Sequence, residues 1–143
     1  MTIKQISVFV ENKPGRLKEI TKVLSDNNID IRALSVADTT DFGIVRLIVN
    51  NPDLAEKVLK QADYTVSITK VIGIGIIDKP GGLYEALNLL DAAHISVEYM
   101  YAFICRQTDA AYVVLRVENN EKAADILKGN NIMLINEEDF YNL

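Results

Sequence analysis

The apolar residues near the start of the chain change from one period to another. Ile6, Val8 and Val10 lie two residues apart, which predicts a strand with one buried face. After a Pro-Gly pair the spacing lengthens to three and four residues, which predicts a helix with one buried face. The apolar positions of this helix are Leu17, Ile20 and Leu24. The pattern therefore predicts a strand followed directly by an amphipathic helix.

The same reading predicts four further elements up to residue 69. Residues 31–38 (IRALSVAD) and 42–50 (FGIVRLIVN) favour two strands, and TTD at 39–41 favours the turn between them. Residues 51–63 (NPDLAEKVLKQAD) carry apolar residues at helical spacing, and YTVSIT at 64–69 favours a last strand. The predicted order is strand, helix, strand, strand, helix, strand.

The chain then repeats this pattern. The stretch VENKPGRL at residues 10–17 has a counterpart, IIDKPGGL at residues 76–83. The two prolines are 80 − 14 = 66 residues apart, and the apolar positions of the strand before them and the helix after them match at the same offset. A second copy of the same unit therefore follows the first.

The offset between the copies grows by two to four residues toward the end of the unit. This predicts a small insertion in the middle hairpin of the second copy, around ICRQTDAA at 104–111. Arg46 can be matched with Arg116, or Asn50 with Asn119, and these two choices differ by one residue. The register of this hairpin therefore stays open.

Two βαββαβ units predict an α+β protein made of two tandem ferredoxin-like units, each an antiparallel sheet with both helices on one face. We expect domain boundaries at 1–69 and 70–143. Gly73 and Gly75 lie inside a predicted strand and should leave a thin outer sheet face against which something packs closely. The acidic end, NEEDFYNL at 136–143, is expected to be a solvated tail.

Composition and charge narrow the classes of function. Asp and Glu outnumber Lys and Arg by 20 to 15, and the basic residues form no stripe, so we expect neither a nucleic acid nor a membrane as partner. No apolar run approaches the ~20 residues of a membrane helix. The N-terminus lacks the features of a secretion signal, so we expect a cytoplasmic protein.

Few residues are available for catalysis or metal binding. The chain has one histidine, His94, and one cysteine, Cys105, so we expect no metal site and no cofactor. An enzyme that uses these two side chains remains a rival hypothesis, but it requires the fold to bring them together from different elements. We expect a protein that is not an enzyme.

The repeated Lys-Pro-Gly turn has chemistry of its own. A helix start leaves N–H groups unpaired and carries partial positive charge, so it can bind a carboxylate. Proline suits the first helical position, and glycine lets a ligand approach the backbone. Asn12 can donate and accept hydrogen bonds, and Asp78 accepts them, as an amino acid's ammonium requires. The alternative is that each turn only starts a helix and that these two residues cap it.

This turn and the elements around it resemble the ACT domain, whose units show a strand, Asp/Asn-x-Pro-Gly-x-Leu and a helix in βαββαβ order. The resemblance covers essentially the whole chain, as two ACT domains without a catalytic domain. The first copy is especially similar to the serine-sensing ACT module of D-3-phosphoglycerate dehydrogenase. ACT domains bind amino acids and other small molecules and regulate metabolic enzymes. The resemblance therefore implies an amino acid sensor that signals to an enzyme; the alternative is a ligand-free interaction module or regulatory subunit.

The resemblance also implies where a ligand binds. In the family, ligands commonly lie between two ACT domains, against the first loop and helix start of one domain and the start of the second strand of the other. In the first repeat the matching positions are Asn12, Lys13, Pro14, Gly15, Arg16, Leu17, Asn28, Ile29, Asp30 and Ile31. In the second repeat they are Asp78, Lys79, Pro80, Gly81, Gly82, Leu83, His94, Ile95, Ser96 and Val97. A homodimer is implied as well.

The two copies of the predicted site differ. Gly82 stands where the first copy has Arg16, and His94 stands where it has Asn28. We therefore expect a charged and roomier opening in the second copy, and the two sites need not share a ligand.

Overall fold

The fold is that of a computed structural model, which describes residues 1–38, 41–103 and 110–142. The chain divides into two compact units, one of residues 4–69 and one of residues 1–3 together with 70–143. Residues 39–40 of the predicted turn and residues 104–109 of the predicted insertion, Cys105 among them, lie outside the described residues.

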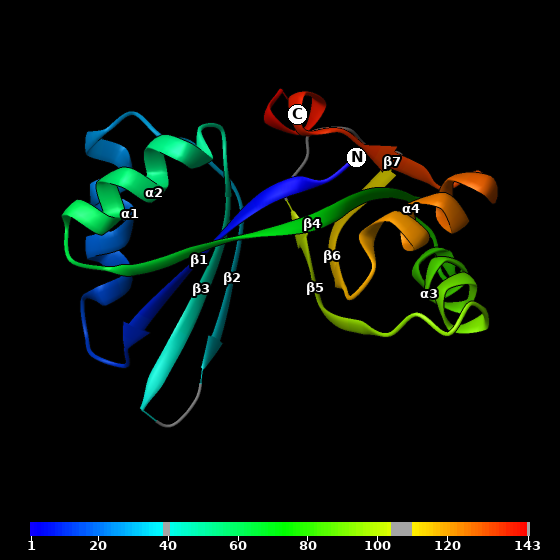
Figure 1. The fold of residues 1–143 in the computed structure, drawn as a ribbon, viewed down its shortest axis with the longest axis horizontal. Coiled ribbons are helices and arrows are strands. Elements are labelled where there is room, and N and C mark those ends of the chain that lie inside the picture. The colour runs from blue at the N-terminus through cyan, green and yellow to red at the C-terminus, as the bar shows by residue number, and fades with distance from the viewer. Residues whose placement is uncertain (39–40, 104–109, 143) are drawn as a thin grey trace. The chain divides into compact units, whose positions relative to one another are not determined.

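The unit of residues 4–69 has one sheet and two helices (Figure 1). Its elements are β1 (Ile3–Glu11), α1 (Arg16–Asp26), β2 (Ile31–Asp38), β3 (Phe42–Val49), α2 (Pro52–Gln61) and the first part of β4 (Thr65–Ile77). The strand order is β2-β3-β1-β4. β3 is antiparallel to both β1 and β2, so β1 and β2 run in the same direction. The core lies between the sheet and the two helices, and Ile6, Leu24 and Leu59 are fully buried in it.

The unit of residues 1–3 and 70–143 repeats this architecture with one addition. Its elements are the second part of β4, α3 (Gly82–Ala92), β5 (Val97–Phe103), β6 (Ala110–Val117), α4 (Asn120–Gly129), β7 (Met133–Ile135) and a short helix, α5 (Glu137–Tyr141). The strand order β7-β4-β6-β5 matches that of the first unit, and its core joins the sheet to α3 and α4. The predicted α+β class of two ferredoxin-like units is confirmed.

The sheet registers settle how the two copies align. Ile31 lies opposite Val49, and Val97 lies opposite Val117, and the ladder shifts after this pair in both copies. The offset is therefore 97 − 31 = 66 on the first strand of the hairpin and 117 − 49 = 68 on the second. A two-residue insertion separates β5 from β6, where the sequence predicted an insertion.

This alignment decides the register that the sequence left open. With an offset of 68, Arg46 corresponds to Val114 rather than Arg116, and Asn50 corresponds to Glu118. Neither of the two matches suggested by residue identity was right, because the buried residues of the ladder set the register and these polar residues do not.

The helix ends repeat as well. Asn28, Asp63, His94 and Asn131 each follow a helix and have positive φ, between 56° and 68°. In each case the next residue donates its N–H to the carbonyl five positions earlier, as Ile29 does to Leu24 at 2.9 Å. This is the Schellman motif, in which a left-handed residue closes the helix and brings two apolar side chains together.

The two glycines of β4 do allow a close approach. A Cβ atom on Gly73 would lie 2.7 Å from Cδ1 of Ile3, and one on Gly75 would lie 3.2 Å from Sδ of Met133. Phe140 of α5 also lies against Gly73 and is only 1% exposed. Its ring centroid is 4.1 Å from that of Phe103.

The expectation of a solvated tail at 136–143 was therefore wrong. Asn136 caps α5 by accepting the N–H of Asp139 at 2.7 Å, so the acidic run forms a short helix. One side of this helix carries Phe140 into the space above Gly73. The acidic composition of this segment suggested exposure to solvent, although its one phenylalanine, Phe140, is buried. Among the described residues, no helix combines the length and apolar character needed to cross a membrane.

Candidate functional site

The first predicted loop joins β1 to α1 through a left-handed glycine. Gly15 has φ 85° and occupies the N-cap position, and among the described residues no side chain caps the helix. Pro14 therefore lies before the cap. The prediction from the sequence, which placed it at the first helical position, was wrong. Gly15 supplies a backbone conformation that other residues adopt only with strain.

The polar side chains of this loop bind within their own unit. Asn12 Nδ2 donates to Oδ1 of Asp38 at 3.1 Å, and Lys13 Nζ pairs with Oε2 of Glu11 at 2.6 Å. The hydrogen bond and the charge of Lys13 lower the pKa of the Glu11 carboxyl. The side chain of Leu17 is 43% exposed on the first turn of α1. Part of this loop's hydrogen-bonding capacity is thus already used to hold β1 against the β2–β3 hairpin.

The corresponding loop of the second unit is more tightly closed. Gly81 has φ 90° at the N-cap of α3 and directly follows Pro80, as Gly15 follows Pro14 in the first loop. The N–H of Gly82 donates to the carbonyl of Lys79 at 3.1 Å, against 3.4 Å for Arg16 and Lys13. A Cβ atom on Gly82 would lie 2.2 Å from the carbonyl oxygen of Ile77. Glycine at this position is a packing requirement, so it does not open the roomier pocket that the sequence suggested.

The loops and the second-strand starts lie at opposite ends of each sheet. Because β1 and β2 run in the same direction, the end of β1 and the start of β2 are far apart within one unit. Asn28, Ile29, Asp30 and Ile31 line a separate pocket with Thr21, Ser25 and Asn50. His94, Ile95 and Ser96 line the equivalent pocket of the second unit, and Val97 begins β5 beside it. The structure does not bring the two predicted sets together within a unit.

The two pockets at the second-strand starts each contain one carboxylate, but it comes from a different position in each unit. In the first unit the backbone N–H of Asp30 donates to Oδ1 of Asn50 at 2.9 Å. The positions equivalent to these two are Ser96 and Glu118, so each pocket contains one carboxylate, but on opposite sides. His94, like Asn28, is the left-handed residue of a Schellman motif, which accounts for its position without catalysis.

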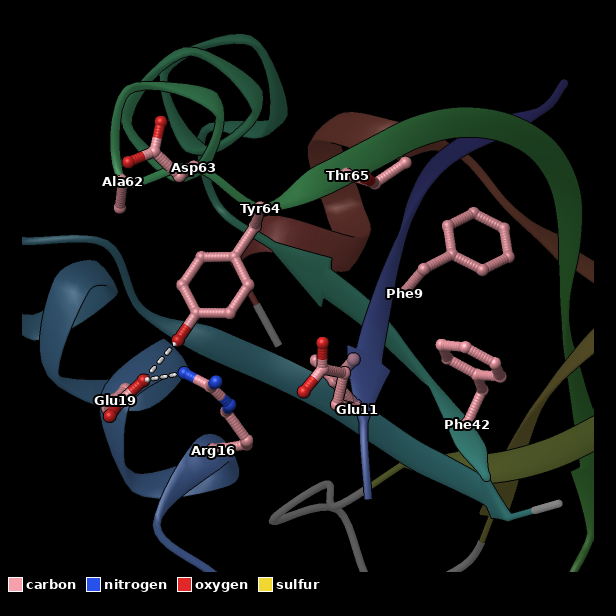
Figure 2. Close-up of a pocket in the computed structure, with 10 residues that line it drawn as sticks. Phe9, Glu11, Arg16, Glu19, Phe42, Ala62, Asp63, Tyr64 and Thr65 are labelled. Atoms are coloured by element: carbon pink, nitrogen blue, oxygen red, sulfur yellow. Dashed lines mark hydrogen bonds and ion pairs between the residues drawn. The ribbon is translucent and has the colours of Figure 1, made fainter. Parts of the chain in front are cut away.

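A further pocket lies beside the first loop of the unit of residues 4–69 (Figure 2). It has a volume of about 530 Å³ and lies where the end of β1 meets the start of α1 and the α2–β4 junction. Its lining residues are Phe9, Val10, Glu11, Arg16, Glu19, Phe42, Ala62, Asp63, Tyr64 and Thr65. Of the residues predicted from the sequence, only Arg16 lines it.

Arg16, Glu19 and Tyr64 form a hydrogen-bonded group on one side of this pocket. Glu19 Oε2 accepts from Arg16 Nη1 at 3.1 Å and from the Tyr64 hydroxyl at 2.8 Å (Figure 2). The Tyr64 hydrogen bond and then the Arg16 pair lower the pKa of Glu19. Burial, followed by the bond to Glu19, raises the pKa of Tyr64, and Glu19 raises that of Arg16. The group is therefore held as a carboxylate, a guanidinium and a neutral phenol.

Sequence reasoning missed most of this pocket. Glu19 and Tyr64 are 45 positions apart, and nothing in either segment indicates that they meet. One signal was available in the repeat: Tyr64 follows the left-handed residue that closes α2, at a position where the second copy has Ile132. A tyrosine at a position that otherwise holds an apolar residue points to a use for its hydroxyl group.

Comparison with known proteins gives a family and a solved structure of high identity. A family model described as an ACT domain pair matches residues 1–143. No curated protein matches the chain. The crystal structure of protein BT0572 from Bacteroides thetaiotaomicron is 43% identical with a TM-score of 0.94, over 100% of this chain and 98% of that one.

Two further solved structures share the fold at much lower identity. The regulatory subunit of aspartate kinase from Thermus thermophilus is 13% identical with a TM-score of 0.62, over 90% of this chain and 92% of that one. Clostridium acetobutylicum aspartate kinase is 10% identical with a TM-score of 0.54, over 90% of this chain and 33% of that one. At these identities the similarity is one of fold.

Proposed function

Because the chain belongs to the ACT domain pair family, we propose that it is a regulatory protein that binds a free amino acid and passes this signal to a metabolic enzyme. The ligand is held at the interface between ACT domains, and the protein itself is not an enzyme. Its domains are residues 1–69 and 70–143, it acts in the cytoplasm, and it forms a homodimer. Binding favours one arrangement of domains or subunits over another, and the partner enzyme responds to that arrangement.

The parallel direction of β1 and β2 is the observation that carries this proposal. The first loop and the start of the second strand lie at opposite ends of one unit, so a ligand that touches both must lie between two domains. These domains belong either to one chain or to two copies of it. The ligand then contacts the first-loop residues 12–17 or 78–83 of one domain and residues 28–31 or 94–97 of another.

The turn motif of the first copy and the shared fold suggest which ligands and partners to test first. We propose serine as the first ligand to test, on the likeness of the VENKPGRL stretch to a serine-sensing module. The fold is also that of the regulatory subunit of aspartate kinase, so an enzyme of amino acid metabolism is the partner class that we propose.

The rival hypothesis is an interaction module that binds no ligand. In the unit of residues 4–69 the first-loop side chain of Asn12 already binds Asp38, which agrees with a turn that only starts a helix. A ligand-free module would regulate its enzyme by association alone.

A thermal shift screen of the full chain against the proteinogenic amino acids separates the two hypotheses. A sensor is expected to show a higher melting temperature with at least one of them. Asn12→Ala should reduce that shift, whereas Asn130→Ala should not, because Asn130 is an exposed amide whose side chain donates to Ile126 of its own helix. If no amino acid raises the melting temperature, the sensor proposal is refuted and the ligand-free module is favoured.

A further inference from the structure

We propose that the pocket of the unit of residues 4–69 is a second ligand site, complete within one unit, for a zwitterion with a flat apolar body, such as an aromatic amino acid. The inference rests on the proposed function in taking a free amino acid as ligand. It places that ligand within a single unit, in the pocket lined by Phe9, Glu11, Arg16, Phe42 and Tyr64.

The apolar side of the site consists of two aromatic rings. Phe9 lies opposite Ile44 in the β1–β3 ladder, and Phe42 lies opposite Glu11, so the two phenylalanines are diagonal neighbours on one sheet face. Phe9 is 44% exposed and Phe42 is 61% exposed. Exposed aromatic neighbours on a pocket wall offer a surface to a planar apolar group.

The polar side of the site offers both charges that a zwitterion needs. Figure 2 shows Arg16, Glu19 and Tyr64 on one side of the pocket and the two phenylalanine rings on the other. The guanidinium has five N–H donors, and its bond to Glu19 uses Nη1, so it can still bind a carboxylate. Glu11 also lines the pocket, and its carboxylate, which pairs with Lys13 through Oε2 at 2.6 Å, can accept an ammonium as well.

The second unit shows that the fold does not require these residues. At the positions equivalent to Phe9, Glu11, Arg16, Phe42 and Tyr64, the second copy has other residues. They are Gly75, Ile77, Gly82, Ala110 and Ile132. The second copy forms the same sheet and helices without an aromatic ring or a charge at any of the five positions. The five residues of the first copy are thus available for a function that the second lacks.

The size of the pocket suits this class of ligand. Its volume of about 530 Å³ lies within the range of roughly 300–1,000 Å³ that small-molecule sites occupy. The charged groups lie at one side and the rings at the other, which matches a ligand with its ammonium and carboxylate on one carbon and an apolar group beyond it. A small polar amino acid would leave the rings uncovered.

Isothermal titration of the full chain with L-phenylalanine tests the proposal. Two analogues, phenethylamine and 3-phenylpropionate, lack the carboxylate and the ammonium. The variants are Phe42→Ala and Arg16→Gln, both at exposed or half-exposed positions. Tyr84→Ala is the matched control for the first, because Tyr84 is an aromatic residue 68% exposed in the other unit. Lys22→Gln is the control for the second, because Lys22 is a cation of α1 paired with Asp26 at 2.6 Å.

We expect L-phenylalanine to bind, and each pocket variant and each analogue to bind about tenfold more weakly or worse, while both controls keep the original affinity. Melting temperatures near that of the unchanged protein show that the variants remain folded. Unchanged affinity in both pocket variants overturns this site and leaves the proposed function intact, as does binding of serine without binding of any aromatic amino acid. Equal affinity for either analogue also overturns it. If no amino acid binds at all, both proposals fail.

Discussion

Replacement of Gly82 by alanine should destabilise the protein because of packing and not because of a lost ligand. Gly82 is the first residue of α3 and is buried, and an added Cβ would lie 2.2 Å from the carbonyl oxygen of Ile77. That oxygen accepts the N–H of Lys79 at 2.9 Å, so it cannot move away without breaking the loop. A backbone oxygen can be displaced far less easily than the end of a flexible side chain.

The magnitude follows from a comparison of three glycines. Overpacking against the backbone at Gly82 should cost about 3 kcal/mol. Gly81→Ala meets no atom within 4 Å but must adopt φ 90°, so it should cost about 1–2 kcal/mol. Gly129→Ala, in α4 with open space around it, should be neutral or stabilise by up to about 1 kcal/mol.

Urea unfolding followed by far-ultraviolet circular dichroism measures these differences. For Gly82→Ala the midpoint should fall by roughly 1 M or more. The two units are linked but compact, so the transition must be tested for two-state behaviour before free energies are compared. A loss for Gly82→Ala no larger than that for Gly81→Ala would refute the packing argument and would restore Gly82 as a position kept open for a ligand.

Three other predictions concern single contacts. Phe140→Ala should lower the free energy of unfolding by about 3–5 kcal/mol, because its ring is buried against Phe103; a loss below about 1 kcal/mol in urea unfolding would show that α5 is not anchored there. The lowered pKa of Glu19 means that its bonds to Tyr64 and Arg16 stabilise the fold above the ordinary carboxyl pKa and are lost as the pH falls through the folded value. Glu19→Gln should therefore weaken the dependence of the melting temperature on pH between about pH 5 and pH 3, and an unchanged pH profile would contradict this assignment. His94→Val should cost about 1–2 kcal/mol and His94→Asn almost nothing, since the residue must be left-handed; equal losses in thermal unfolding would point to a role for the imidazole instead.

The repeat itself was predictable because it rests on periodicity. Apolar spacing and the Lys-Pro-Gly turn fix where strands and helices begin, and the same pattern 66 residues later indicates a second unit. The register of the β5–β6 hairpin was not predictable. Residue identity suggested that Arg46 matches Arg116 or that Asn50 matches Asn119. The strand pairing instead matches Arg46 with Val114 and Asn50 with Glu118. Surface side chains carry little information about strand pairing, whereas the buried partners of a ladder determine it.

The fold class, the two units and the turns that start α1 and α3 could be read from the sequence, because they depend on local spacing and on residues such as Gly15 and Gly81. What lies next to those turns depends on how the whole chain folds. Glu19 and Tyr64 meet across 45 residues, and Phe140 closes over Gly73, because sheet order and helix packing bring distant segments together. A pocket is a property of several segments at once, so apolar spacing and turn motifs could not indicate the one beside Arg16, and only the unmatched Tyr64 of the repeat pointed to it.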